Sequence, residues 1–416
     1  MIGTKRAINF VQGVHGFDDW EVIVLASKPF NNNLDDKLNE QIPESVVVNY
    51  GFVGLFRGLI KFLDGGFKSK RPKKVEPKKI KEKQSSKSKK KKSSLTPFDQ
   101  YLWDIGSGYR NGRKLIKKYK PDVIWVNADP WSGFLVANKL SRKFGIPWVA
   151  DLRDPWTIFE KKMELRPKIT ANTIKRYERN FFETASKVVL NSETACEAYK
   201  KSYSDLPSEK FTFIRNAYNK KLLNEGKPKQ VADKFIFGYF GGFRQFVPSN
   251  FILKGFADFI KKNNLTPNEV CFEVRGSLYA DFHDQVEECG LKEFVVIGKE
   301  VTQDEAVSLL RSWDVLMLSA ISDFKWMISG KFYDYLFIRK PILAVSDNEE
   351  LNRLIEETES GDWANTADTE KIVSLYEKYF RLGKTDLLNN ELLIEPFGIE
   401  AQGASFRKVL KEIKKH

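Results

Sequence analysis

Short runs of apolar residues alternate along the chain with longer segments of mixed polarity. The runs occupy residues 21–26, 45–49, 122–127, 147–151, 187–191 and 211–215 in the first half, and 234–240, 269–275, 293–298, 313–319 and 341–346 in the second. Most of them lack a polar residue at every second position, which is typical of strands covered on both faces. Segments 132–144 and 170–185 have the pattern of helices between strands. The alternation predicts an α/β fold with parallel, doubly wound sheets.

The polar stretch 217–233 divides this pattern into two similar halves. It contains Asn224, Gly226 and Pro228, a composition typical of linkers between domains. A chain of 416 residues is long enough for two domains of ordinary size. We therefore predict two Rossmann-like domains facing a cleft, one over residues 1–216 and one over 234–396. A last helix, over 397–416, is expected to pack back on the first domain.

The opening residues depart from the pattern of such a domain. A Rossmann-like domain begins with a buried strand, whereas residues 1–17 have the pattern of a helix that leads into the run 21–26. Two explanations remain open: the first strand lies upstream of the assigned start, or the protein lacks it. Its absence would remove a loop that usually faces the cleft.

The net charge of +14 comes almost entirely from one segment. Residues 66–94 hold fourteen Lys or Arg residues and two Glu, a net charge of +12. Because the segment is nearly free of apolar residues, we predict a disordered basic insertion. Residues 52–63, just before it, place apolar side chains in one stripe at helical spacing. Three interpretations remain open: a solvated insertion, contact of residues 52–94 with an anionic membrane, or nucleic-acid binding, which the scarcity of rings disfavours.

Composition excludes several other classes of protein. Hydrophobic residues make up 42% and charged residues 30% of the chain, as in ordinary globular domains. No stretch approaches the roughly 20 apolar residues of a membrane-spanning helix, and no secretory signal pattern is present. The three cysteines lack paired spacing and the histidines number three. We therefore expect no disulfide framework, metal or other cofactor, in a cytoplasmic protein or one attached to the inner face of the cell membrane.

Residues 323–346 carry the clearest chemical signal. Ser329 is a predicted helix N-cap, Gly330 allows close approach, and a helix follows from Lys331. A helix N-terminus presents free N–H groups and about half a positive charge, which suits a diphosphate. Lys331 adds a cation at the same end. Asp334 follows one turn later, where its carboxylate could accept hydrogen bonds from ribose hydroxyls.

The stretch KFYDYLFIRKPILAV, residues 331–345, resembles the donor-site segment of the retaining GT-B glycosyltransferases of family four, the group 1 glycosyltransferases. The stretches FTFIRNAYN (211–219) and FGYFGGF (237–243) also stand in the family's order. The resemblance covers most of the chain, and its specific part is residues 323–345. It implies a GT-B fold with an acceptor-side N-terminal domain and a C-terminal domain that binds a nucleotide-activated sugar.

The resemblance also implies roles for single residues. Asp334 stands at the later of two acidic positions of the family. Eight residues earlier this chain has Trp326, and Asp323 is the candidate substitute for the missing acid. Arg244, after a glycine turn, is a candidate cation on the diphosphate, and Arg275 is a candidate contact of the nucleobase.

A second group of candidates stands at the ends of two predicted strands on the acceptor side. Asp151, Arg153, Asp154 and Trp156 belong to the stretch ADLRDPW, and Asp129 follows the preceding strand. The carboxyl ends of parallel strands face the ligand cleft. We expect Asp151 or Asp154 to orient the reacting hydroxyl, with Lys331 as the catalytic cation on the donor side. A local network of Asp and Arg that holds the turn is the alternative.

These observations predict a retaining hexosyltransferase that moves a sugar from a nucleoside-diphosphate sugar to a glycan or lipid-linked acceptor. By resemblance, the expected context is surface polysaccharide biosynthesis. Two alternatives stay open: a GT-B nucleotide-sugar epimerase, and a catalytically degenerate, membrane-associated binding protein. The expected partners are the donor, the acceptor and an anionic membrane surface, and nucleic acid is not expected.

Overall fold

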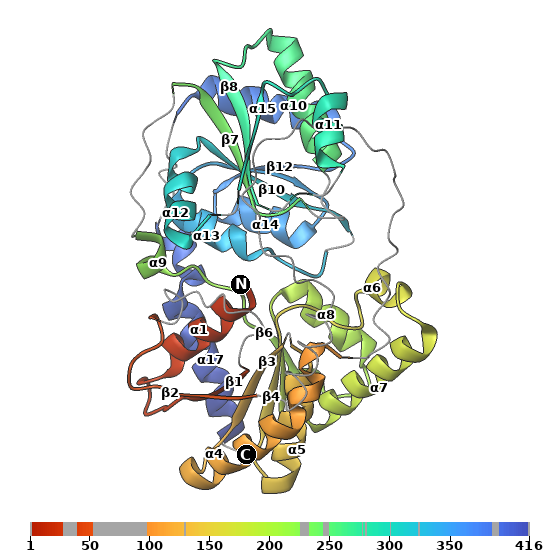
Figure 1. Cartoon of the computed structure of the whole chain (residues 1–416), viewed down its shortest axis with the longest axis vertical. Coiled ribbons are helices and arrows are strands. Elements are labelled where there is room, and N and C mark those ends of the chain that lie inside the picture. The colour runs from red at the N-terminus through yellow and green to blue at the C-terminus, as the bar shows by residue number, and fades with distance from the viewer. Residues whose placement is uncertain are drawn as a thin grey trace, which may run out of the picture.

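The computed structural model describes residues 2–27, 40–52, 98–128, 130–224, 233–243, 249–276, 278, 281–299, 301–322, 325–384 and 391–414. The predicted insertion 66–94 lies outside these residues, as does nearly all of the apolar stripe 52–63. The candidates Asp129, Arg244 and Asp323 also lie outside them. Two α/β domains follow one another along the long axis of the molecule (Figure 1).

The C-terminal domain is built on one sheet of six parallel strands in the order β12-β11-β10-β7-β8-β9. Its strands are β7 (Phe235–Phe240), β8 (Val270–Arg275), β9 (Val295–Gly298), β10 (Val315–Ala320), β11 (Ile342–Ser346) and β12 (Gly361–Ala364). Its helices are α10 (Ser249–Asn263), α11 (Phe282–Glu288), α12 (Gln303–Ser312), α13 (Gly330–Ile338), α14 (Glu349–Glu357) and α15 (Thr369–Leu382). The order runs outward in both directions from β7 and β10, as in a doubly wound sheet.

Both faces of this sheet are covered, which explains the continuous apolar runs of the sequence. Successive residues of β11 alternate between two cores: Leu343 and Val345 pack with side chains of α10 and α15, whereas Ile342 and Ala344 pack with side chains of α12, α13 and α14. A strand buried on both faces needs apolar residues at every position. The pattern that predicted the strands is therefore a consequence of the two helical layers.

The N-terminal domain holds its strands in two separate parallel sheets. In one, β1 (Ile23–Ser27) pairs with β2 (Val47–Phe52), and in the other the order is β3 (Ile124–Ala128), β4 (Trp148–Leu152), β5 (Lys187–Leu190) and β6 (Phe211–Phe213). The helices of this domain are α1 (Ile2–Val14), α4 (Ile105–Tyr119), α5 (Ser132–Phe144), α6 (Glu160–Glu164), α7 (Lys168–Thr184) and α8 (Glu193–Ser202), with 3-10 turns η1 (Gln100–Asp104) and η2 (Ser208–Lys210). Helix α9 (Lys220–Asn224) leads toward the second domain.

The last helix, α17 (Ile399–Lys414), packs against α1. The short elements α16 (Glu391–Ile394) and η4 (Glu395–Phe397) precede it. A Cβ atom on Gly13 would lie 2.6 Å from the Cα atom of Gly403, so the two helix backbones touch where both residues are glycine. Phe406 then packs edge-on against Phe10 and Trp125, with ring centroids 5.2 and 5.3 Å away. The chain thus ends on the domain in which it began.

The fold class predicted from the sequence is confirmed: the molecule has two α/β domains with parallel sheets. The opening helix and the helices expected over 132–144 and 170–185 are observed as α1, α5 and α7. The run 211–215 forms a shorter strand than expected, because β6 ends at Phe213. Among the described residues, no helix combines the length and the apolar character needed to cross a bilayer.

Candidate functional site

The start of α13 lies at the carboxyl edge of the six-stranded sheet. Ser329 is the N-cap, and its hydroxyl accepts a hydrogen bond from the Lys331 N–H at 3.4 Å. The Lys331 ammonium lies 4.5 Å above the ring of Tyr239 and 3.4 Å from its hydroxyl oxygen. Because Tyr239 belongs to β7, the first turn of α13 and the end of β7 meet here. The helix boundary and the cap agree with those predicted from the sequence.

Two glycines form the wall of the same region. Gly241 follows β7 with φ +114°, and a Cβ atom there would lie 2.5 Å from the Lys331 Nζ atom. Gly276 follows β8 with φ +148°, and a Cβ atom on it would lie 2.4 Å from the Gly241 carbonyl carbon. The positive φ disfavours a side chain at both positions, and at Gly276 the backbone of Gly241 also leaves no space for one. Bare backbone on one side and the Lys331 ammonium on the other make an edge suited to a phosphate.

Asp334 lies on the same helix and faces the N-terminal domain. Its Oδ2 atom is 3.1 Å from the Nζ atom of Lys5 on α1, and the two side chains are 21% and 25% exposed. The pair therefore joins the two domains across the first turns of α1 and α13. Sequence reasoning did not identify Lys5, because only the tertiary fold brings residue 5 to residue 334.

Arg275 ends β8 and is already engaged within its own domain. It pairs with Glu273, whose other oxygen accepts a hydrogen bond from the Trp313 indole at 3.0 Å. A Cβ atom on Gly298 would overlap the Arg275 guanidinium, so this side chain lies across the end of β9. The side chain of Arg275 is 24% exposed. It is thus placed at the edge of the sheet, toward β9 and away from Lys331.

Asp151 is buried at the end of β4 and is fully engaged by protein donors. Arg6 donates to its Oδ1 atom at 2.7 Å, and Trp125 and Asn127 donate to its Oδ2 atom at 3.2 and 3.0 Å. Both partners of the ion pair are at most 2% exposed. Arg6 also donates to the Ile214 carbonyl at 2.9 Å. Our expectation that Asp151 contacts a substrate hydroxyl is therefore not favoured, since it has no open face; it fixes α1 onto the sheet.

The Asp154 side chain is more exposed than that of Asp151, and it forms the local Asp–Arg pair that was the alternative to a role in substrate binding. Arg153 donates to Asp154 at 2.8 Å, and the two side chains are 18% and 24% exposed. Trp156 is 5% exposed and stacks on Trp131 with ring centroids 4.4 Å apart and an interplanar angle of 7°. Trp156 is thus a core residue under the loop, which corrects its expected place on the acceptor surface. Arg153 and Asp154 remain the partly exposed candidates of this loop.

A buried carboxylate supports this loop from below. Glu178 on α7 accepts hydrogen bonds from the Thr157 N–H and hydroxyl and from the hydroxyls of Tyr199 and Tyr203. Its complete burial raises the pKa of Glu178 to about 7, although the hydrogen bonds favour the charged form. No motif in the sequence indicated Glu178, because its partners come from two other segments, the loop at Thr157 and the end of α8.

Trp326 and Glu350 join the two domains on another side of the interface. The Trp326 ring packs against the core of the N-terminal domain, and its carbonyl accepts a hydrogen bond from the Ser192 hydroxyl at 2.8 Å. Glu350 accepts from the backbone N–H groups of Glu193 and Thr194 at 3.0 and 2.9 Å and also pairs with Arg215. Burial opposes its ionisation, yet Arg215 and these donors hold the pKa of Glu350 below its ordinary value. The position that holds an acid in the resembled family is thus used here for packing between domains.

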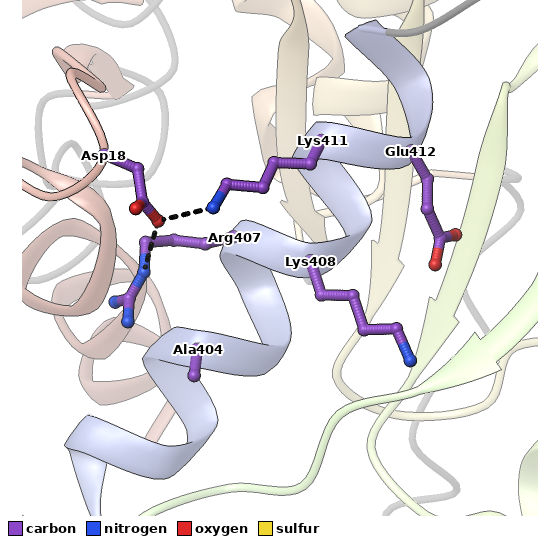
Figure 2. A pocket seen from close by; sticks show the side chains of 6 residues that line it. All are labelled: Asp18, Ala404, Arg407, Lys408, Lys411 and Glu412. Atoms are coloured by element: carbon purple, nitrogen blue, oxygen red, sulfur yellow. Dashed lines mark ion pairs between the residues drawn. The ribbon is translucent and has the colours of Figure 1, made fainter.

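A surface pocket beside α17 lies away from these groups. Arg407, Lys408 and Lys411 project from α17 around it, and Asp18 reaches in from the turn after α1 (Figure 2). Asp18 pairs with Arg407 at 3.2 Å and with Lys411 at 3.1 Å. Within the described residues, no group of three or more His, Cys, Asp or Glu is placed to hold a metal ion. The strongest candidate site therefore remains the edge formed by Lys331, Gly241 and Gly276.

Comparison with known proteins links this geometry to one fold. Residues 76–221 match the sequence model of Glycosyltransferase Family 4. A search of curated proteins found no match. The lipopolysaccharide outer core galactosyltransferase WaaB in its apo form is similar in structure with a TM-score of 0.57 and 12% identity, over 99% of this chain and 95% of that one. The fold is GT-B.

Two further structures share it. Sucrose-phosphate synthase of Thermosynechococcus elongatus has a TM-score of 0.56 and 14% identity, over 76% of this chain and 79% of that one. HepE of Anabaena, in complex with UDP-glucose, has a TM-score of 0.56 and 16% identity, over 74% and 82% of the two chains. Identities this low establish a common fold. The family match adds a likeness to Glycosyltransferase Family 4 over residues 76–221.

Proposed function

We propose that this protein is a retaining glycosyltransferase that transfers a hexose from a nucleoside-diphosphate sugar to a glycan or lipid-linked acceptor. The observation that carries the proposal is the edge at which the first turn of α13, Lys331 and the bare backbone of Gly241 meet. The family match over residues 76–221 supports the same class of reaction. The retaining course and the role in surface polysaccharide biosynthesis follow from the resemblance of residues 331–345.

The chemistry assigns one task to each side of the edge. In the transfer, the bond between the anomeric carbon and the diphosphate oxygen breaks, and the acceptor oxygen forms the new bond to that carbon. Negative charge accumulates on the leaving diphosphate, where the N–H groups of α13 and the Lys331 ammonium would stabilise it. The proton of the acceptor hydroxyl leaves with the diphosphate. Fixed positive charge at this edge supplies what a metal ion would otherwise supply.

Ribose and acceptor contacts complete the proposal. Asp334 would accept hydrogen bonds from the ribose hydroxyls when the donor binds, in competition with the Lys5 ammonium that now pairs with its Oδ2 atom. On the acceptor side we propose Asp154, with Arg153 beside it, as the group that orients the hydroxyl. Arg244 and Asp323 remain candidates for the donor diphosphate and sugar from their place in the sequence alone. The structure of HepE holds UDP-glucose, which makes UDP the first ligand to test.

The test is a titration of the full chain with UDP, GDP and ADP by calorimetry, followed by assays with the matching sugar nucleotides. We expect one nucleoside diphosphate to bind. We expect Lys331→Ala to lower turnover at least tenfold, a loss of about 1.4 kcal/mol of transition-state stabilisation. Thermal unfolding of this variant should be unchanged. Lys292→Ala is the matched control, since Lys292 is an exposed lysine of the same domain outside α13. Unchanged turnover in Lys331→Ala would rule out the proposed role of Lys331.

One alternative has an observation in its favour. Trp326 fills the interface at the position where the resembled family has an acid. A binding protein that has lost catalysis would not need that acid. That alternative predicts that none of the three nucleoside diphosphates binds to the wild-type chain. The same titration therefore separates the two, and the anomeric configuration of the product, read by NMR, decides whether transfer occurs with retention.

We also propose a site of action at the inner face of the cell membrane, where a lipid-linked acceptor would lie. The lysine-rich residues 66–94 and the apolar stripe 52–63 are the sequence features behind this proposal. Each lysine held near an anionic bilayer contributes about 1 kcal/mol to attachment.

A further inference from the structure

Helix α4 carries five cations and no acid. They are Arg110, Arg113, Lys114, Lys117 and Lys118, and all five are exposed. Their spacing of i, i+3, i+4, i+7 and i+8 places them along one side of the helix. The opposite side buries Gly108, Gly112 and Ile116. The cations therefore form one stripe that points away from the core.

Helix α5 extends this charge on the neighbouring surface. Lys139, Arg142 and Lys143 are exposed, and α5 also contains no acid. The two helices touch closely, because a Cβ atom on Gly112 would lie 2.5 Å from a methyl carbon of Leu140. The Lys139 ammonium lies 4.6 Å above the ring of Tyr109 on α4. The eight cations of α4 and α5 thus make one continuous area, which we call the α4–α5 surface.

The charges of the α4–α5 surface are uncompensated. Among the described residues, none of its eight cations forms an ion pair with a carboxylate. Exposed cations elsewhere often do: Lys262 pairs with Glu377 and Lys378 pairs with Asp362. Like charges one helical turn apart destabilise a helix by a few tenths of a kcal/mol for each pair. A surface that keeps five such residues on one stripe is therefore not arranged for the stability of the helix alone.

The place of this surface in the molecule leaves the candidate site open. Helices α4 and α5 form the end of the N-terminal domain that is farthest from the C-terminal domain (Figure 1). A partner that covers this end would not cover the edge formed by Lys331 and Gly241.

We propose that the α4–α5 surface binds an anionic lipid bilayer. Eight exposed cations without ion-pair partners complement the negative headgroups. Single-stranded nucleic acid fits less well, because it stacks bases on open aromatic rings. The two tyrosines of α4 are each covered by a lysine: Lys139 lies over Tyr109, and Lys118 lies 4.7 Å above Tyr119. The inference concerns a folded surface and depends neither on the proposed reaction nor on residues 66–94.

The test is sedimentation of the full chain with vesicles of phosphatidylcholine, either alone or mixed with phosphatidylglycerol. The variant is Lys114→Gln, Lys117→Gln and Lys118→Gln together, which removes three of the five positive charges of the stripe without introducing a negative one. The matched control is Lys254→Gln, Lys261→Gln and Lys292→Gln, three exposed lysines of the C-terminal domain that change the net charge equally. Both are made with and without a deletion of residues 66–94, because that segment could bind the same vesicles.

We expect binding only to the vesicles that contain phosphatidylglycerol, weaker at high salt. In the chain that lacks residues 66–94, binding to the vesicles should persist. The α4 variant should lower the vesicle affinity of that chain at least tenfold, which corresponds to about 1.4 kcal/mol of binding free energy. The control variant should bind like its parent. Equal loss in the two triple variants would overturn the proposal, as would an α4 variant that binds vesicles normally. Reduced affinity for an oligonucleotide with unchanged vesicle binding would assign the surface to nucleic acid.

Discussion

The two domains share one chain pattern yet differ in how their sheets are held together. The C-terminal sheet is continuous over six strands, and β11 is buried along its whole length. The N-terminal strands form two sheets, and every residue of β1 remains partly exposed. Between those two sheets the described residues share no ladder hydrogen bond. Helix α1 is instead fixed to the larger sheet by the buried pair of Arg6 and Asp151.

This difference shows where polar groups serve chemistry and where they serve the fold. In the C-terminal domain, the backbone ladder holds the sheet, so the polar groups at its edge, such as Lys331, are available to a ligand. In the N-terminal domain, buried carboxylates hold elements that lie outside the ladder: Asp151 holds α1, and Glu178 holds the loop after β4. A buried charge is tolerated only with its partners in place. We therefore expect substitution of the buried carboxylates of the N-terminal domain to lower stability, and substitutions at the edge of the C-terminal sheet to lower ligand binding or turnover.

The largest expected effect is on Asp151. Asp151→Asn leaves the Arg6 charge buried without its counter-ion, so we expect the free energy of unfolding to fall by about 3–5 kcal/mol. Asp154→Asn is the matched control; its partly exposed pair is worth less than about 1 kcal/mol, while the proposed transfer should slow. Urea unfolding and a transfer assay measure both. A stable but inactive Asp151→Asn protein would restore Asp151 as a catalytic candidate.

The buried carboxylate Glu178 predicts a pH dependence of stability. Its pKa in the folded state is about 7, against an ordinary value of 4.5, so the folded protein holds a proton that the unfolded chain releases. This stabilisation is fully present below pH 4.5 and is lost as the pH rises through about 7. The free energy of unfolding should fall by up to roughly 3 kcal/mol over that interval.

Glu178→Gln is the variant that isolates this term, since an amide does not titrate. We expect the part of the slope due to residue 178 to vanish when unfolding by urea is followed at several pH values. A slope identical to that of the wild type would mean that other groups cause it.

On the donor side, two glycines with positive φ separate the effect of close packing from the effect of backbone strain. Gly276→Ala adds a Cβ atom 2.4 Å from the Gly241 backbone, so the edge must move, and we expect at least tenfold weaker binding of the nucleoside diphosphate. Gly290→Ala is the control, because Gly290 also has a positive φ, +68°, but open space around it. It should cost about 1–2 kcal/mol of stability from backbone strain and leave affinity unchanged. Calorimetry and thermal unfolding distinguish the two.

The smallest expected effect lies where the domains meet. Lys5→Met frees Asp334, and a partly exposed ion pair is worth at most about 1 kcal/mol. We expect the affinity for the nucleoside diphosphate to rise by no more than about fivefold. A clear fall in affinity would instead show that Lys5 itself contacts the ligand, and would add an N-terminal cation to the donor site.

The donor side could be predicted from the sequence to a large extent. Three features of this side are local: the N-cap at Ser329, the helix that follows and the strand after Arg339. Capping and termination in the αL conformation depend on neighbouring residues. Residues 331–345 pointed to a glycosyltransferase, and the family match over residues 76–221 gives independent support. Asp151, Trp156 and Trp326 were less predictable. Asp151 is covered by α1, Trp156 by α7 and Trp326 by the N-terminal domain, and no local pattern in the sequence shows these contacts.

The sequence by itself determined the two α/β domains, the helix that presents Lys331 and the concentration of charge in residues 66–94, because periodicity, capping and composition act over a few residues. Tertiary structure alone decided that Asp151 is enclosed by Arg6, that Lys5 pairs with Asp334, and that Trp326 packs into the other domain. The physical reason is desolvation. Whether a charged or aromatic group is available to a ligand depends on what covers it, and in each of these three cases a covering partner lies more than a hundred positions away.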